Sequence, residues 1–293
     1  MINKFDRRGM MRLMSTAGLV LCLPVAVWAA EVSEEAAALV PTGIKEAGVL
    51  RIAMPDQGKP FAYKDGDALK GMDPDLAVAV ANTLGLEPKI ELVPFDSALT
   101  GLAADKFDMS YGEFYIRPER LEVADFVTSW QTYNSFLVRG DSAIVPETLP
   151  DLCGYKAAAM AASAQLADLQ KAAAACPADK VLEVSAFPAA SNAVLALTSG
   201  RVDAVFADRG VAEAAIVSDP TLKATGKSAA AVMAIAIKRG ESTDGLAAAV
   251  QAAMQHLHET GEYLTILQAN GVDYGAIDSF EVYDETSTPP VYE

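Results

Sequence analysis

The 293-residue sequence has only three cysteines and two histidines, so side chains that bind metals are scarce. His256 and His258 are two residues apart in a stretch with helical periodicity, which directs them to different faces of a helix. Cys22, Cys153 and Cys176 lack the spacing to either histidine that zinc sites use. The sequence therefore predicts no metal site, and nothing in it indicates a cofactor.

Basic residues are also few, because 23 Lys and Arg stand against 39 Asp and Glu, for a formal net charge of −16. The first thirty residues hold four Lys and Arg and one Asp, a net of +3, which leaves −19 for the rest of the chain. So acidic a surface argues against nucleic acid and anionic membranes as partners. It does not identify a ligand, because solvated acidic faces give the same charge balance.

Beyond the first thirty residues the sequence has no apolar run of membrane-spanning length. At the start, basic residues precede the apolar run "LMSTAGLVLCLPVAV", and "VWAA" offers small residues for cleavage after Ala29. This pattern is typical of a secretory signal peptide over residues 1–29. The pair Arg7-Arg8 leaves general secretion, which we favour, and twin-arginine export both open, while Leu21 before Cys22 argues against a lipid anchor.

The remaining cysteines, Cys153 and Cys176, would then lie in an exported, periplasmic chain. An oxidising compartment favours a disulfide between them. The alternative is two buried free thiols.

The first half of the chain alternates between strand and helix patterns. We expect strands over 49–54, 89–95 and 107–114 and a helix over 98–106. Another helix is expected between the first two strands, with Asp73 as its N-cap, Pro74 as its first residue and Gly85 as its stop. Such alternation predicts a parallel sheet covered by helices.

After residue 139 the pattern starts again and later returns to the first unit. The expected fold is therefore α/β with two lobes, the second inserted into the first, and chain crossings near residues 137–141 and 229–235. A single long helix is expected over 243–271, and the acidic C-terminal tail is expected to lie over the surface or to be partly disordered. The predicted divisions are 46–138 for the first part of lobe 1, 139–230 for lobe 2, 231–274 for the return to lobe 1, and 275–293 for the tail.

Five segments occur in an order that resembles the amino-acid type (family 3) extracellular solute-binding proteins of ABC importers. They are "PFAYKDGDALKGMDPDLAVAVANTLG", "FDSALTGLAADKFDMSYGEFYIRPERLEVADFV", "DLCGYKAAAMAAS", "LTSGRVDAVFAD" and "GEYLTILQANG". The resemblance covers about residues 48–272. It implies the type II periplasmic-binding-protein fold, in which two hinged lobes close over a small solute, and a monomeric receptor that delivers the solute to a membrane permease.

The resemblance also implies site residues. Arg120, in "PER" before "DF", matches the arginine that holds a ligand carboxylate, and its guanidinium has the paired donors for that contact; a loop arginine bonding nearby carbonyls is the alternative. Asp208, at the end of "GRVDAVFAD", matches the acceptor of the ligand ammonium, although an Asp there also suits a helix N-cap. Ser163 matches a hydroxyl donor at a helix start, with Ala162 replacing the usual glycine.

The chain departs from the family pattern at several positions. Pro55 and Gly58 replace the usual Asp and aromatic residue, and Phe95 matches the opposing wall of the site, where a core role is also open. Glu113 and Tyr115 replace the small and hydroxyl residues that usually precede the arginine. A solute with extra positive charge, or one without a free carboxylate, would suit these two substitutions.

Three roles are open for Glu113. Its carboxylate meets a cation on the solute, it pairs with Arg120, or it turns outward to solvent or to Arg117. The resulting hypothesis is a receptor for an amino acid or a derivative, including a cationic one, and not an enzyme. The rival is an exported enzyme on the same fold that resembles cyclohexadienyl dehydratase, for which Glu113 is the sole unusual candidate as proton donor or base.

Overall fold

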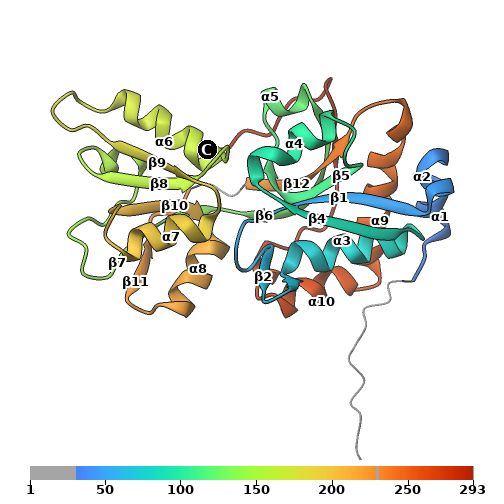
Figure 1. Ribbon diagram of the computed structural model, residues 1–293, viewed down its shortest axis with the longest axis horizontal. Coiled ribbons are helices and arrows are strands. Elements are labelled where there is room, and N and C mark those ends of the chain that lie inside the picture. Colours follow the sequence, from blue (N-terminus) through green and yellow to red (C-terminus); the bar gives the residue numbers. More distant parts are fainter. Residues whose placement is uncertain (1–30, 229–230, 293) are drawn as a thin grey trace, which may run out of the picture.

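The computed structural model describes residues 31–228 and 231–292. The predicted signal peptide, with Arg7, Arg8 and Cys22, lies outside the described residues. Two lobes lie side by side, each built on its own β-sheet with helices on both faces (Figure 1). Among the described residues, no helix has both the length and the apolar character needed to cross a membrane.

Lobe 1 contains a six-stranded sheet in the order β13-β6-β12-β5-β1-β4. Its strands are β1 (Val49–Pro55), β4 (Glu87–Val93), β5 (Met109–Tyr115), β6 (Ala124–Thr132), β12 (Ala231–Lys238) and β13 (Val282–Tyr283). Strand β1 pairs in parallel with β4 and β5, whereas β12 runs antiparallel between β5 and β6. Every residue of β5 is buried, as expected of a central strand covered on both faces. Glu113 therefore lies within the protein interior.

Helices cover both faces of this sheet, and a hairpin flanks α3 (Figure 1). The helices are α1 (Glu34–Ala38), α2 (Thr42–Ala47), α3 (Met72–Thr83), α4 (Phe95–Ala103), α5 (Pro118–Leu121), α9 (Leu246–Glu259) and α10 (Glu262–Ala269), and the hairpin strands are β2 (Tyr63–Asp65) and β3 (Ala68–Lys70). Along β1, Ile52 and Met54 pack into the core beneath α3 and α9, while Ala53 packs with the α4 side. This alternation follows the two-residue period of a strand.

Lobe 2 contains a five-stranded sheet in the order β11-β7-β10-β8-β9. Its elements are β7 (Asn134–Arg139), β8 (Lys156–Met160), α6 (Ala164–Ala175), β9 (Glu183–Phe187), α7 (Ala190–Thr198), β10 (Ala204–Asp208), α8 (Arg209–Ser218) and β11 (Leu222–Thr225). Three short 3₁₀ helices complete the described chain, η1 (Leu149–Leu152), η2 (Glu241–Thr243) and η3 (Asp273–Gly275). The parallel strands β8 and β10 end beside the N-termini of α6 and α8, so both helix starts face lobe 1 (Figure 1).

The first crossing between the lobes comes earlier than the predicted 137–141. Strand β6 ends at Thr132 in the first sheet, and β7 begins at Asn134 and pairs with β10 and β11 of the second. The stretch 134–138, placed in lobe 1 by the sequence analysis, thus belongs to the second sheet. The apolar pattern of β7 identifies it as a buried strand but does not say which sheet it joins. The return crossing lies between Thr225 and Ala231.

Two helix predictions are also wrong in detail. The N-cap of α3 is Gly71, and Asp73 is the second residue of the helix, with its side chain fully buried. The long C-terminal helix is two helices, α9 and α10, separated at Gly261, which adopts the left-handed backbone that glycine favours. The apolar periodicity continues through both helices, so the sequence pattern does not show where the first one ends.

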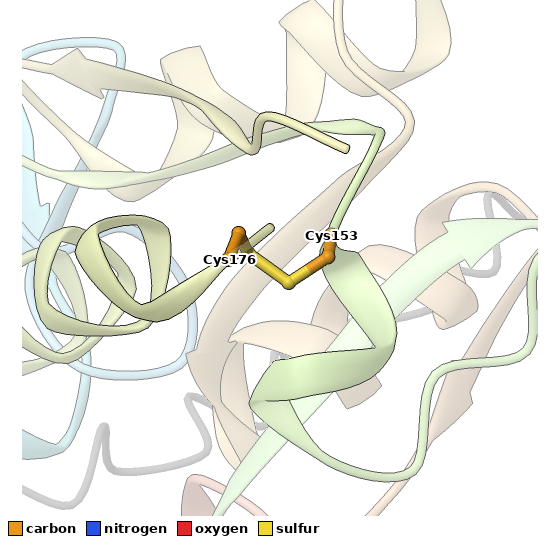
Figure 2. The surroundings of a disulfide bond; sticks show 2 residues. All are labelled: Cys153 and Cys176. Atoms are coloured by element: carbon orange, nitrogen blue, oxygen red, sulfur yellow. A yellow bond between two sulfur atoms is a disulfide. The ribbon is translucent and has the colours of Figure 1, made fainter. Parts of the chain in front are cut away.

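The predicted disulfide between Cys153 and Cys176 is confirmed, and it joins η1 to the C-terminal end of α6 (Figure 2). The bridge spans 23 residues and fixes the far end of α6, whose opposite end begins at the cleft between the lobes.

The C-terminal tail adds β13 to the edge of the first sheet and then returns to the junction of the lobes (Figure 1). There the hydroxyl of Tyr292 accepts a hydrogen bond from the backbone N–H of Ile116 at 2.8 Å, and its ring packs against Tyr115. The described part of the tail therefore packs against lobe 1, beside the segment that carries Arg120.

Candidate functional site

A cavity lies between the lobes, and the six residues predicted to bind ligand all line it. Lobe 1 contributes Phe95, Glu113, Tyr115 and Arg120, and lobe 2 contributes Ser163 and Asp208. Most of the other lining residues are apolar: Gln57, Phe61, Met160, Ala164, Gln165, Ala190, Ala193, Val205, Phe206, Ala207, Val211 and Met233. The cavity therefore combines apolar walls with a few charged groups, which is typical of sites for small molecules.

Arg120, on the single turn α5, spans the cleft. Its Nη1 donates to the carbonyl of Tyr115 at 3.0 Å, and its Nη2 donates across the cleft to the carbonyl of Ala162 at 3.1 Å. The guanidinium also lies 5.7 Å from the ring centroids of both Phe95 and Phe114. Burial lowers the pKa of Arg120 to about 10, so the group remains charged at neutral pH.

No Asp or Glu among residues 31–228 and 231–292 forms an ion pair with Arg120, although only 8% of the residue is exposed. A guanidinium has five N–H donors, and the carbonyls take two of them. Both predicted alternatives for Arg120 thus fit one geometry, because it bonds local carbonyls and keeps donors for a carboxylate.

Asp208 ends β10 and caps α8. Its Oδ1 accepts from the backbone N–H of Gly210 at 2.7 Å, while its Oδ2 is buried and has no hydrogen-bond partner among the described residues. Arg209 next to it pairs with Glu213 at 2.6 Å and lies over Tyr274, and it forms no ion pair with Asp208. Burial raises the pKa of Asp208 to about 7. One oxygen therefore serves as the helix cap and the other is available to a ligand.

Glu113 points inward, with only 5% of its surface exposed, and no donor group in the described part of the chain bonds either carboxyl oxygen. It does not form an ion pair with Arg120, and Arg117 instead pairs across the cleft with Asp168 at 3.1 Å. The structure thus contradicts two of the three predicted roles, pairing with Arg120 and turning outward. Burial, and then the neighbouring carboxyl of Asp73, raise the pKa of Glu113 well above its ordinary value.

Asp73 lies directly behind Glu113 and was missed as a possible site residue. It is fully buried, and its Oδ2 accepts from Nε2 of Gln57 at 3.1 Å. Burial raises its pKa to about 7. A sequence signal existed, because Asp73 falls at helical spacing with Leu76 and Val80 on the apolar face of α3, where an acid requires an explanation.

Tyr115 belongs to a chain of hydrogen bonds that joins the lobes. Its hydroxyl accepts from Nδ2 of Asn134 at 2.7 Å, and Oδ1 of Asn134 accepts from Nε2 of Gln165 at 2.8 Å. Gln165 lies in the first turn of α6, while Asn134 begins the strand that follows the first crossing. Tyr115 therefore helps to hold the closed arrangement as well as lining the cavity.

Ser163 is the N-cap of α6. Its hydroxyl donates to the carbonyl of Met160 at 2.7 Å and accepts from the N–H of Leu166 at 3.1 Å. Ala162 has a φ of 57°, so the turn keeps the left-handed backbone that glycine favours, even with alanine there. The substitution preserves the turn, and the carbonyl of Ala162 accepts from Arg120.

The lobes are in contact around the cavity. A Cβ atom added at Gly210 would lie 2.9 Å from the ring of Phe61 and 3.1 Å from Pro60, so only glycine permits this approach of α8 to lobe 1. At the other rim, Gly58 approaches Ser191 of α7. Together with the pairs Arg120–Ala162 and Arg117–Asp168, these contacts describe a closed cleft. Within 31–228 and 231–292, no cluster of three or more His, Cys, Asp or Glu residues is arranged to hold a metal ion.

A family model and several known proteins match the chain over most of its length. The family model for bacterial extracellular solute-binding proteins, family 3, matches residues 50–271. The arginine-binding protein ArgT of Corynebacterium glutamicum is 30% identical over 261 residues, 83% of this chain and 81% of that protein. An L-arginine-binding protein of Pseudomonas aeruginosa is 28% identical over 74% of this chain and 85% of that protein.

Solved structures share the fold. An ancestral arginine-binding protein bound to arginine has a TM-score of 0.71 at 28% identity and covers 76% of this chain and 98% of its own. An ancestral amino acid-binding protein described as a precursor of cyclohexadienyl dehydratase has a TM-score of 0.69 at 23% identity, covers 78% of this chain and 97% of its own, and shows the fold alone. With two lobes, the inserted second sheet and a match over residues 50–271, the chain belongs to the bacterial extracellular solute-binding proteins, family 3.

Proposed function

We propose that the protein is a periplasmic receptor that encloses one amino acid or amino-acid derivative between its lobes and presents it to the permease of an ABC importer. One observation carries the proposal. Among the residues that the structure describes, the guanidinium of Arg120 is buried in the cleft without an acidic partner, and the carboxyls of Glu113 and Asp208 are buried there without a basic partner. Arg120 and Glu113 belong to lobe 1, and Asp208 faces them from lobe 2.

A zwitterionic solute would satisfy both groups at once. Its carboxylate would meet the free N–H groups of Arg120, where charge assistance and the planar fork favour a paired contact. Its ammonium group would donate to Oδ2 of Asp208, the buried oxygen that lacks a donor. A buried unpaired charge costs several kcal/mol, so the empty closed cleft is unfavourable and the filled one is stabilised. The names of the arginine-binding relatives agree with a solute of this class.

Closure follows from the same contacts. Arg120 bonds Ala162 of the other lobe, and Arg117 pairs with Asp168, so both link α5 to lobe 2. The two chain crossings provide the hinge, and the lobes would open about them to admit the solute.

A second candidate is kept because one observation favours it. A buried glutamic acid with a raised pKa can serve as a general acid. In a dehydratase, such a group would donate its proton to the leaving group. Transport needs no such chemistry, and the other arrangements in the cleft are those of binding.

A ligand screen with a structural readout tests the proposal. We expect thermal stabilisation by some member of a panel of amino acids and amines, and a smaller radius of gyration by X-ray scattering when that solute is added. Arg120→Ala should abolish both effects, whereas Arg139→Ala, on the far part of lobe 2, should not. Recovery of the solute chemically unchanged supports a receptor, and its conversion to a dehydrated product supports the enzyme. A tight ligand that leaves the scattering unaltered would contradict closure.

A further inference from the structure

The carboxyl groups of Asp73 and Glu113 form a pair inside lobe 1. The two carboxyls are neighbours, since each shifts the pKa of the other, and two carboxyl groups can share a hydrogen bond only while one of them carries a proton. When both are ionised, both oxygens of Glu113 and Oδ1 of Asp73 lack a donor. Of the two, Glu113 lines the cavity and Asp73 lies behind it.

The surroundings of this pair supply almost no positive charge. Gln57 donates one hydrogen bond to Asp73, Tyr111 and Tyr263 are the neighbouring phenols, and Asp208 faces Glu113 from lobe 2. The arginines near the cleft are engaged elsewhere: Arg120 with two carbonyls, Arg117 with Asp168, and Arg209 with Glu213. No described cation pairs with either carboxyl.

A wholly structural pair would not need to face the cavity. Buried carboxyls without partners are costly, and replacing Glu113 by a small or apolar residue would remove that cost. The arrangement instead places Glu113 in the wall of the cavity, with Asp73 as a neighbouring carboxyl that can share its charge. The described acids are not arranged to hold a metal ion, which leaves an organic cation as the complementary group.

We infer that the Glu113–Asp73 pair is a second cation subsite, which takes the guanidinium, amidinium or distal ammonium group of a solute whose net charge is +1. The inference rests on the proposed receptor function and narrows its substrate class. Glu113 makes the direct contact, and Asp73 is a positioning residue that acts through Glu113.

The charges of the cleft balance with such a solute. Arg120 contributes one positive charge, Asp208 one negative charge, and the pair one negative charge when it holds a single proton. A solute with a carboxylate, an α-ammonium group and a second cation matches these three positions one to one. A neutral amino acid would leave the pair without a partner, and an acidic one would place like charges together.

The pair also predicts how affinity depends on pH. As the pH falls, protons occupy the carboxyl oxygens that the second cation would contact. Preference for a cationic over a neutral solute of the same shape should therefore fall between pH 8 and pH 5, because protonation removes the charge that distinguishes them. Gln57 and the two tyrosines, which face the pair from other elements, do not change charge in that range. Asp208, which faces Glu113 from lobe 2, does titrate there. It would meet the α-ammonium group that both solutes carry, so its protonation lowers both affinities and not their ratio.

Calorimetry with arginine and citrulline tests the inference, because the two differ chiefly in a guanidinium against an uncharged ureido group. Wild-type protein should prefer arginine by at least about 30-fold at pH 8, the lower end expected for a desolvated charge contact. Glu113→Gln should reduce this ratio to below about 3-fold, and Asp73→Asn should lower it partially and flatten its change with pH. Two variants serve as matched controls. Glu119→Gln changes an exposed acid near Glu113, and Asp75→Asn changes an acid that lies on α3 like Asp73 but is hydrogen-bonded to Asn270.

The outcomes separate the two claims. If wild type binds citrulline or glutamine as tightly as arginine at every pH, the inference is overturned and the receptor proposal stands. The same holds if folded Glu113→Gln keeps the wild-type ratio. If Glu113→Gln does not fold, the pH dependence of the wild-type ratio decides. If arginine, citrulline, glutamine, glutamate and agmatine all fail to bind, both the inference and the amino-acid proposal are contradicted.

Discussion

Asp208→Asn should stabilise the ligand-free protein while it weakens solute binding. The substitution keeps a side-chain oxygen for the backbone N–H of Gly210, since Asn caps helices about as well as Asp. It removes the charge from the second oxygen, which is buried without a partner. A carboxylate retained only as a helix cap would show no gain in stability and no loss of binding.

The magnitude follows from the pKa. Burial raises the pKa of Asp208 from its ordinary 3.8 to about 7. Below pH 3.8, Asp208 therefore has no effect on the free energy of unfolding. Above that pH it lowers the free energy of unfolding, because the unfolded chain releases the proton first, and the loss grows until the pH passes the folded pKa. At about 1.4 kcal/mol for each unit, the full penalty above pH 7 is at most about 4 kcal/mol, and less than half of it remains at pH 5. Asp208→Asn should recover this penalty at pH 8 and little at pH 5.

Chemical unfolding of wild type, Asp208→Asn and Asp208→Ala at both pH values measures the effect without solute. Asp208→Ala should recover less than Asp208→Asn, since it also loses about 1 kcal/mol of capping. With solute present, both variants should bind about 30- to several-thousand-fold more weakly. Equal destabilisation by Asn and Ala at pH 8, with affinity unchanged, would refute the assignment of the second oxygen to a ligand.

Three further predictions concern neighbouring features. Arg120→Lys keeps the charge but loses the planar fork, so it should weaken solute binding at least about 10-fold, a cost of about 1.4 kcal/mol. An affinity equal to that of wild type, measured by calorimetry, would contradict this prediction. Protein prepared without reductant should show no alkylatable thiol at Cys153 or Cys176 by intact mass, and reduction should lower the unfolding free energy by about 3 kcal/mol; two alkylated thiols before reduction would rule out the bridge. Ala162→Gly should raise the unfolding free energy by about 1 kcal/mol, because glycine adopts the left-handed backbone without the steric cost of a Cβ; a lower midpoint in denaturant would contradict this.

Much of the site was predictable because its residues occupy motif positions at which the family places ligand-binding residues. Arg120 and Asp208 stood out by their motifs, and Glu113 stood out by departing from one. All three line one cavity. Their roles toward a solute remain proposals.

The remainder depended on three-dimensional arrangement. Asp73 looked like a helix cap because Asp before Pro suits that position, and only the burial of the first turn of α3 shows it beside Glu113. Strand β7 reads as a buried strand, but its partner β10 lies about seventy residues further along the chain, so local pattern does not show which sheet it joins. The hydrogen bond of Arg120 to Ala162 depends on how the lobes close, which sequence periodicity does not record.

Native mass spectrometry of gently purified protein tests the central claim, that a solute is held between the lobes, most directly. We expect one small nitrogen-containing molecule bound to each chain. That molecule should be absent from a variant that carries both Arg120→Ala and Asp208→Ala, and should bind again to wild type after unfolding and refolding. A wild-type chain that neither retains nor rebinds any such molecule, or a double variant that holds it equally well, would contradict the account.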